Sequence, residues 1–497
     1  MSIQSYLQDF WRTIYIKFLL FTVTLAPLLF GFHLGELNAP SAVITCDKKS
    51  IRQQSISLPQ CIPMSAAEFG LVQSIFTLGG LIGALAAGPV SSKRGRLFTM
   101  RINTIPVVLG PFIEALAPNV ALLSIGRLLS GVGAGAGLVV VPIYISEIAP
   151  SASKGFYGSF TQIMTNCGIF ITQLIGYFLS HDSMWRVILG VAGVIGIMHT
   201  CQLFFAVESP KWLAERGRRK ESREALSKIR GTEDGLDEEI RSWGIDVKKI
   251  VSEGDEEPER QGLLSQSESH SAEQHESDEL GYIQVVRNPN YRRAILAVIL
   301  VMTAQQLTGI NSIIMYGVSL LSGLLSSSSA LLNILVSLLN IVATTAFAPL
   351  TDHPRLGRKG CLLVSIAGMA TSSVLLGIGI RTSTKVLSAI CVLTFVASFA
   401  FGLGPVPFML PSEFVDSKGV GATQSWALAA NWIATFIVAQ FFPIVNEKLG
   451  KGIVYFLFCG LGAFFLASVW WYVPETRGKK GMADVWGLEE ERAGHED

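Results

Sequence analysis

The stretch RAILAVILVMTAQQLTGINSIIMYGVS, from Arg293 to Ser319, combines two properties that decide the fold. It is apolar and long enough to cross a bilayer as a helix, which needs roughly 20 residues. It nevertheless carries Gln305, Gln306 and Asn311 in its interior. Amide side chains cost free energy in contact with lipid unless something pairs with them. The pattern therefore predicts a membrane helix with one face toward a polar interior.

The composition of the whole chain indicates that the bilayer is its main solvent. Half of the 497 residues are hydrophobic and only 15% are charged, and the mean hydropathy is +0.45. A water-soluble chain of this length needs more charge to cover its surface. The net charge of +1 gives no reason to expect a nucleic-acid partner. The first apolar run, about 16–32, lacks a small-residue cleavage site and is predicted to be a membrane helix.

Apolar runs of membrane-spanning length occur in two sets of six. The first set lies near 15–36, 66–90, 98–117, 119–142, 156–179 and 186–207. The second set lies near 293–319, 327–351, 361–380, 385–411, 421–443 and 451–473. This pattern predicts an all-α membrane protein with twelve transmembrane helices, whose two six-helix halves enclose a site near the middle of the membrane.

The polar segments complete the predicted organisation of the chain. The expected parts are a cytosolic N-terminus 1–14, an N-terminal bundle 15–207, a cytosolic central loop 208–291, a C-terminal bundle 292–473 and a cytosolic tail 474–497. An acidic, serine-rich insert at about 252–280 cannot bury a core, so we expect it to be disordered. Short loops rich in Lys and Arg place both termini in the cytosol, although Lys48, Lys49 and Arg52 oppose this orientation.

Cysteine and histidine give little sign of metal or catalytic chemistry. No CxxC motif or Cys/His cluster has the spacing of a metal site, so we expect no metal and no cofactor. No nucleophile stands with a base in a recognisable context, which disfavours an enzyme. Cys46 and Cys61 share the polar segment after the first predicted helix. They form a disulfide if that segment faces an oxidising compartment, and otherwise remain two thiols.

A short basic loop with glycine occurs twice, six predicted helices apart. It reads SKRGR at 92–96 and returns as Asp352 with Gly357, Arg358 and Lys359. Glutamates fall at the predicted cytosolic helix ends, where they can pair with arginines and helix termini. We therefore expect a cytosolic gate, against the alternative of ordinary positive-inside charge. Its predicted members are Arg96, Arg127, Glu147, Glu208, Asp352, Arg358 and Glu413.

Eight segments, in order and spacing, resemble the sugar porter family of the major facilitator superfamily, which includes glucose facilitators, fungal hexose transporters and proton–sugar symporters. They are GRLLSGVGAG and PIYISEIAP within 126–150, VESPKWL at 207–213, QQLTGINSIIMYG at 305–317, LGRKG at 356–360, GLGPVPF at 402–408, NW at 431–432 and PETRG at 474–478. The resemblance runs from Gly31 to Gly478, apart from the acidic insert. It implies the major facilitator fold and transport of a small polar solute, with a sugar sensor of little transport activity as the alternative.

The resemblance also implies a set of solute-binding residues. Positions where the family contacts sugar are occupied by Gln162, Gln305, Gln306, Asn311, Asn340, Asn431 and Trp432, and Phe408 stands where the family usually has tryptophan. Amides offer donors and acceptors to hydroxyl groups without adding charge. The alternative is that these amides only join helices, and it is strongest for Asn340. Ala400, Ser92 and Val420 depart from polar or charged family residues, which leaves the solute open between a monosaccharide and a polyol.

Helix one carries His33 in FGFHLGELNAP, at the position where proton-coupled relatives have Asp and facilitators have Asn. Histidine titrates near neutral pH, and Glu36 follows one helical turn later. Together they are candidates for proton coupling. The alternative is a neutral histidine that bonds a neighbouring helix.

The acidic insert contains Glu259, Leu263 and Leu264 in an ExxxLL pattern. Such a pattern in a cytosolic loop is typical of signals read by sorting adaptors, although it also arises by chance. The expected location is therefore the plasma membrane or a vacuolar or endosomal membrane.

Overall fold

The computed structural model describes residues 3–47, 58–150, 154–233, 235–243, 281–325, 329–347, 356–415, 417–450, 452–479 and 482–487. Within these ranges all regular secondary structure is helical. The acidic insert with Glu259, Leu263 and Leu264, and also Asp352, lie outside the described residues.

The N-terminal half contains six long helices. They are α1 (Ile3–Gly35), α3 (Ala66–Arg94), α4 (Arg96–Leu116), α5 (Val120–Ile148), α6 (Lys154–Leu179) and α7 (Trp185–Leu203), with a short α2 (Ser41–Ile44) after α1. The central segment adds α8 (Pro210–Glu215), α9 (Arg219–Arg230) and α10 (Leu236–Ser242).

The C-terminal half repeats this plan with two of its helices interrupted. Its helices are α13 (Tyr282–Arg287), α14 (Pro289–Leu307), α15 (Ile310–Leu325), α16 (Ser329–Phe347), α17 (Gly357–Arg381), α18 (Lys385–Phe401), α19 (Val406–Phe414), α20 (Ser417–Leu449), α21 (Ile453–Tyr472) and α22 (Met482–Trp486). The pairs α14–α15 and α18–α19 each form one crossing, so the second half also crosses six times.

Eleven spans of the described chain are long and apolar enough to cross a membrane, and α4 supplies the twelfth crossing. Arg101, Glu114 and two prolines make α4 the most polar of the twelve. The fold predicted from hydropathy, an all-α membrane protein with twelve helices in two halves, is confirmed.

The predicted single helix at 293–319 is wrong in one respect, because the chain breaks at Thr308 and Gly309. Gly309 has φ of +99°, a conformation that residues with a Cβ rarely adopt. A Cβ there would also lie 2.5 Å from the ring of Phe458. The break leaves the amides of Gln305 and Gln306 at the end of α14 and that of Asn311 at the start of α15.

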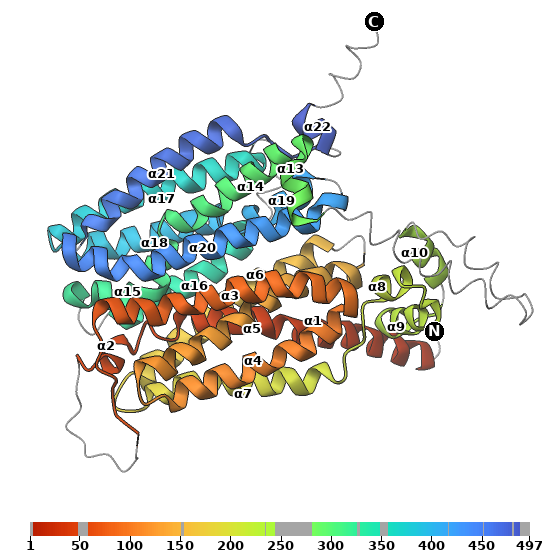
Figure 1. Cartoon of the computed structure of the whole chain (residues 1–497), viewed down its shortest axis with the longest axis horizontal. Helices are drawn as coiled ribbons and strands as arrows, with labels where there is room; N and C mark the ends of the chain where they lie inside the picture. The colour runs from red at the N-terminus through yellow and green to blue at the C-terminus, as the bar shows by residue number, and fades with distance from the viewer. Residues whose placement is uncertain are drawn as a thin grey trace, which may run out of the picture.

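The two halves lie side by side with their long helices running in roughly the same direction (Figure 1). One end of the bundle carries α2, and we call it the α2 side. The other end carries α8, α9, α10, α13 and α22 together with the labelled N and C termini, and we call it the termini side (Figure 1). The halves meet where α3 packs on α20, α6 on α16 and α1 on α15.

Within the N-terminal half, α3 and α5 cross at very short range. A Cβ on Gly83 would lie 2.0 Å from the carbonyl oxygen of Val132, and one on Gly131 would lie 2.0 Å from that of Phe76. Small residues at such crossings let helix backbones touch directly, which is the usual way that membrane helices associate. These two helices therefore pack backbone against backbone.

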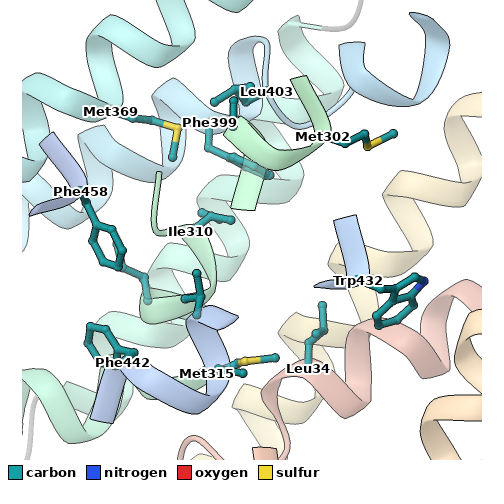
Figure 2. Packing of buried hydrophobic residues seen from close by; sticks show 14 of the residues in the cluster. Leu34, Met302, Ile310, Met315, Met369, Phe399, Leu403, Trp432, Phe442 and Phe458 are labelled. Carbon is teal, nitrogen blue, oxygen red and sulfur yellow. The ribbon is translucent and has the colours of Figure 1, made fainter. Parts of the chain in front are cut away.

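Apolar side chains from both halves fill the contact between them. Leu34 and Trp432 lie near each other at this contact, and Ile310, Met369 and Phe458 lie around the break between α14 and α15 (Figure 2). Trp432 is 2% exposed and packs edge-on against Phe30. The polar groups described below are embedded in this apolar packing.

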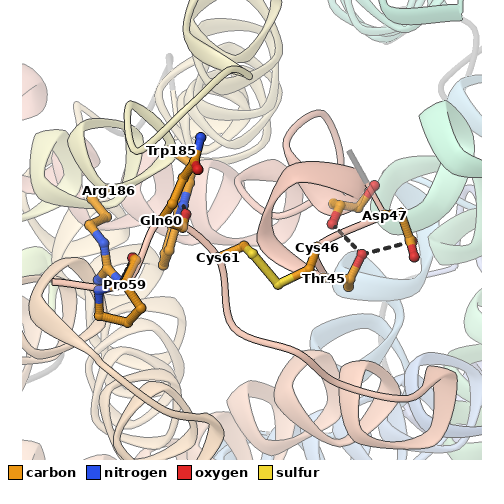
Figure 3. The surroundings of a disulfide bond; sticks show 9 residues. Thr45, Cys46, Asp47, Pro59, Gln60, Cys61, Trp185 and Arg186 are labelled. Carbon is orange, nitrogen blue, oxygen red and sulfur yellow. Dashed lines mark hydrogen bonds between the residues drawn. A yellow bond between two sulfur atoms is a disulfide. The ribbon is translucent and has the colours of Figure 1, made fainter. Parts of the chain in front are cut away.

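A disulfide joins Cys46 and Cys61 on the α2 side (Figure 3). The sequence left open whether these cysteines form a disulfide or remain two thiols, and the structure contains the disulfide. The segment before Cys61 is held by α7, because Trp185 Nε1 donates to the Gln60 carbonyl at 2.8 Å and Arg186 Nη2 donates to the Pro59 carbonyl at 2.8 Å. The bridge thus fastens the loop after α1 to the start of α7.

Candidate functional site

Four of the predicted site residues form one hydrogen-bonded group at the break between α14 and α15. Asn311 Nδ2 donates to Gln306 Oε1 at 2.6 Å, and Gln306 Nε2 donates to Gln305 Oε1 at 3.1 Å. Asn431, from α20, donates to the same Gln305 oxygen at 2.6 Å. All four side chains are at most 9% exposed. Their amides satisfy one another in this apolar surrounding, as buried polar groups require.

Gln305 is the anchor of this group, which we call the amide chain. Its Nε2 donates to the carbonyls of Leu403 and Gly404, at 2.6 and 3.2 Å, in the break between α18 and α19. Backbone carbonyls freed by a helix break are thereby used to orient a side chain. Gln306 and Asn311 have only amide partners, so they are the members that can exchange those partners for solute hydroxyl groups.

A second amide group crosses from one half to the other. Asn166 of α6 accepts from Gln162 at 3.1 Å and from Asn340 of α16 at 3.3 Å. Asn166 also donates to Thr344 Oγ1 at 3.1 Å. The structure thus brings Gln162 and Asn340 together through Asn166 and Thr344, two residues that the sequence did not single out. A small cavity nearby is lined by Gln173, Asn333, Ser337 and Asn340 with apolar neighbours.

The two aromatic candidates differ in their placement. Trp432 is buried between the halves, and its Nε1 has no hydrogen-bond partner among the described residues. Phe408, on α19, is 39% exposed, and the structure does not bring it into either amide group. An unpaired indole N–H inside the protein is a donor available to a bound hydroxyl group.

Charged residues meet at a third place, in the α2-side part of the N-terminal half. His33 Nδ1 lies 2.9 Å from Glu36 Oε1, and Arg127 Nη1 donates to the same oxygen and to the carbonyl of His33. Glu114 of α4 completes the cluster, since its carboxylate, that of Glu36 and the His33 ring offer atoms within 4.8 Å of one another. We call these four residues the buried charge cluster; each is at most 2% exposed.

The prediction that Arg127 belongs to the cytosolic gate is wrong. Arg127 follows the α2-side start of α5, whereas Glu147 lies 20 residues later at the other end of that helix. A rise of about 1.5 Å per residue separates them by roughly 30 Å. The segments GRLLSGVGAG and PIYISEIAP both lie along α5. Arg127, in the first of them, pairs with Glu36 and not with a predicted gate glutamate.

The remaining described gate residues form two matching groups on the termini side. In the N-terminal half, Arg96 pairs with Glu147 at 2.8 Å, and Glu208 accepts from the backbone N–H groups that begin α4. In the C-terminal half, Arg358 pairs with Glu413 at 3.1 Å. Glu475 accepts there from the N–H groups that begin α17. Each of these contacts stays within its own half.

Three further side chains form hydrogen bonds between the halves on the α2 side. Asn38 bonds α15 through both ends of its amide, and Gln73 of α3 donates to the Met315 carbonyl at 3.4 Å. Ser74 of α3 donates to Gln440 of α20 at 2.8 Å. The α2 side is therefore held closed by direct contacts between the halves.

Sequence reasoning missed Glu114, Asn166, Asn38 and Gln73. Glu114 sits in the predicted helix at 98–117, where an acid inside an apolar run is itself a signal of function. Asn166 follows Gln162 by four residues and shares its helix face. Nothing in the sequence pattern marks Asn38 or Gln73, because their partners are backbone groups of the other half.

Comparison with known proteins was made on both sequence and structure. Residues 19–483 match the family described as "Sugar (and other) transporter". A probable metabolite transport protein of Saccharomyces cerevisiae is 32% identical over 93% of both chains. The facilitated glucose transporter protein 1 of Caenorhabditis elegans is 31% identical over 93% of this chain and 89% of its own. The vacuolar protein sorting-associated protein 73 of S. cerevisiae is 30% identical over 91% and 92%.

Among solved structures, an inward-open form of the xylose transporter XylE from E. coli superposes with a TM-score of 0.73. It covers 95% of this chain and 99% of its own at 21% identity. A partially occluded inward-open form of the same transporter gives a TM-score of 0.72 at 22% identity, over 93% and 100%. These likenesses establish a shared fold.

Proposed function

This chain belongs to the sugar porter family of the major facilitator superfamily, and we propose that it moves a monosaccharide or a polyol across its membrane by alternating access. The family is one of transporters, so the chain is a membrane carrier and not an enzyme.

The amide chain is the observation that carries the proposal. Asn311 Nδ2 donates to Gln306 Oε1 at 2.6 Å, and the hydroxyl groups of a sugar or polyol offer both donors and acceptors in exchange. Gln305 stays fixed by the Leu403 carbonyl and presents its oxygen to Gln306 and Asn431. Because amides carry no charge, the site favours neutral polar solutes over ions. Trp432 adds an unpaired N–H and an aromatic face beside it.

Alternating access follows from where the halves are joined. The α2 side is closed by Asn38, Gln73 and Ser74, while the arginine–glutamate pairs of the termini side stay inside each half. This arrangement fits a state whose exit is on the termini side. Opening the α2 side requires the halves to rock about the contact of α6 and α16, which breaks those hydrogen bonds.

Proton coupling is a second element of the proposal, and the buried charge cluster supports it. His33 and Glu36 touch at 2.9 Å, and Glu36 also faces Arg127. The buried pair of Glu36 and Arg127, with the His33 imidazole beside it, can bind or release a proton only if its surroundings change. Rocking of the halves supplies such a change. The carrier would then use a proton gradient to accumulate its solute.

The membrane and orientation remain part of the proposal. Lysine and arginine on the termini side favour the cytosol there, and a disulfide on the α2 side suits an oxidising lumen or exterior. Sorting adaptors would bind the ExxxLL signal formed by Glu259, Leu263 and Leu264 and direct the protein to a vacuolar or endosomal membrane. If adaptors do not bind this signal, the protein would remain at the plasma membrane.

The decisive experiment is uptake of labelled sugars and polyols by proteoliposomes that contain the purified protein. Uptake that saturates and exceeds that of empty liposomes supports a carrier, and one preferred solute defines its class. Repeating it with and without an imposed pH gradient separates coupled from facilitated transport. Solute binding without any uptake would contradict the proposal and favour a sugar sensor.

A further inference from the structure

Glu114, in the last turn of α4, is a buried carboxylic acid that forms no ion pair with any described residue. Its Oε1 accepts from Ser130 Oγ, and its Oε2 has no hydrogen-bond partner among the described residues. Its side chain is packed against α5, because a Cβ on Gly126 would lie 2.5 Å from Glu114 Cγ. Glu36 differs, since one of its oxygens contacts both Arg127 and His33.

The two carboxyl groups are too close to be ionised together at low cost. Their oxygens and the His33 ring nitrogen lie within 4.8 Å of one another, and all are buried. With both acids ionised and His33 neutral, one guanidinium leaves a net charge of −1 in the cluster. Like charges at this range in a weakly polarisable interior favour a proton on one of them.

Geometry decides which acid holds that proton. Glu36 is stabilised as a carboxylate by Arg127 and lies 2.9 Å from the His33 ring, whereas Glu114 receives one hydroxyl donor. We propose that Glu114 is the proton-binding residue of this carrier, protonated while the α2 side is closed and ionised when that side opens. This inference rests on the proposed transport function and assigns its proton to a residue outside the sequence-predicted pair.

Other polar groups around the cluster have hydrogen-bond partners outside it among the described residues. From α7, Arg186 donates to the carbonyls of Ala115 and Ala117, which holds the end of α4. From α15, Tyr316 donates to the carbonyl of Ala439. From α3, Gln73 is uncharged. The titratable and charged groups that face Glu114 are therefore His33, Glu36 and Arg127.

Gln73 connects the charge of Glu114 to the closure of the α2 side. Its Oε1 accepts from Arg127 Nη2 at 3.3 Å, while its Nε2 donates to the carbonyl of Met315 in the other half. An ionised Glu114 would attract Arg127 and compete with Gln73 for its guanidinium. Gln73 would then lose the partner that orients it toward α15. Deprotonation of Glu114 thus favours opening, and closure favours protonation by the same factor.

The test measures linkage in the purified full-length protein with D-glucose as the probe, by tryptophan fluorescence. In the wild type we expect the Kd to rise with pH by up to about tenfold per pH unit within part of the range from about pH 5 to about pH 8. A pH indicator in weak buffer should report uptake of about one proton per bound sugar.

Glu114→Gln mimics the protonated acid, so its Kd should stay at the low-pH value and its proton uptake should vanish. Glu114→Asp should keep the pH dependence with a displaced midpoint, and Glu224→Gln, on the exposed face of α9, should match the wild type. Size-exclusion profiles and melting curves identify folded variants. Should Glu114→Gln misfold, loss of pH dependence in Gln73→Ala without loss of D-glucose binding supports the assignment.

Different failures have different meanings. A Glu114→Gln variant that binds D-glucose with wild-type pH dependence overturns the assignment and leaves the transport function standing. A pH dependence that survives in Glu114→Gln and disappears in His33→Asn moves the proton to the histidine, and so also overturns it. A wild type that binds neither D-glucose nor any member of the sugar and polyol panel overturns the proposed function itself, and this inference with it.

Discussion

Asn38 holds Ile314 across the boundary between the halves, and it does so with a side chain that bonds twice. Its Nδ2 donates to the Ile314 carbonyl at 2.7 Å, and its Oδ1 accepts from the backbone N–H of Val318 at 3.0 Å. Ile314 lies about one turn and Val318 about two turns beyond Asn311, the proposed solute-binding residue at the start of α15. The contacts that close the α2 side are therefore made with α15, the helix whose first turn carries Asn311.

Replacing Asn38 by Ala should release this attachment. Two hydrogen bonds of about 1 kcal/mol each shift the equilibrium toward an open α2 side by roughly 30-fold. Hydrogen exchange should be faster in the peptide containing the Val318 amide, and slower again when solute is added. Asn119→Ala is the control, because Asn119 caps α5 on the same side but bonds only Leu122 of its own half. Unchanged exchange in Asn38→Ala would mean that other contacts dominate closure.

Removing an amide from the amide chain should abolish most transport. Gln306→Ala and Asn311→Ala each delete solute hydrogen bonds worth about 1 to 3 kcal/mol apiece, so uptake at low solute concentration should fall by roughly tenfold or more. Expression and melting temperature should change little in comparison. Asn290→Ala, an exposed amide at the start of α14, should transport normally. Wild-type affinity in both site variants would refute the assignment of these residues.

His33 should influence coupling and leave binding intact. His33→Asn removes the ring that contacts Glu36 at 2.9 Å, and we expect a facilitator that equilibrates solute but no longer accumulates it. His33→Asp should retain coupling with a displaced pH optimum, because a carboxyl group in place of the imidazole changes the charge that faces Glu114. Solute accumulation in proteoliposomes under a proton gradient, with and without an ionophore, measures both. Equal plateaus with and without the gradient in the wild type would show a uniporter.

Breaking the disulfide between Cys46 and Cys61 should lower the stability of the protein. Cys46 and Cys61 close a loop with a sequence separation of 15, for which the chain-entropy effect is about 3 kcal/mol. Cys46→Ser or treatment with a reductant should lower the melting temperature of the purified protein by several degrees. Cys201→Ser, which replaces an exposed unpaired thiol, should have no such effect. Identical melting curves for the oxidised and reduced protein would show that the bridge adds no stability.

Leu263→Ala with Leu264→Ala should move the protein toward the cell surface. An adaptor pocket for this pattern needs both leucines, so the double variant should lose vacuolar or endosomal retention. Quantitative microscopy of a fluorescent fusion measures the distribution, and Gln261→Ala serves as the neighbouring control. A distribution that does not change would make the pattern a coincidence.

Hydropathy was sufficient to predict the twelve crossings, because each run had to satisfy the same length requirement. It placed the ends less well: the predicted helix 119–142 runs on to Ile148 as α5, and 421–443 extends from Ser417 to Leu449 as α20. Helices continue past the hydrocarbon layer once their polar ends find partners, and hydropathy does not register those partners. The break at Gly309 was equally invisible, since glycine is common inside membrane helices.

The candidate site was predictable only as far as residue types allow. The resemblance located Gln305, Gln306, Asn311 and Asn431, which the structure joins in one chain of hydrogen bonds. Arg127 was misplaced because the motif that contains it spans a whole helix and so touches both sides of the membrane. Glu114 was overlooked because its role depends on side chains from α1 and α5 that come together only on folding.

The backbone contact between α3 and α5 determines how this half transmits force. Where Gly83 and Gly131 meet carbonyl oxygens directly, no flexible side chain lies between the helices to absorb a displacement. We therefore expect the N-terminal half to move as a rigid body along the whole length of α5. We expect a tilt imposed near Arg127 to be carried along α5 to Glu147, while the hydrogen bond of Asn166 with Thr344 lies at the contact with the other half. A single methyl group added at Gly83 or Gly131 would push α3 and α5 apart, and would therefore disturb the contacts at both ends of α5.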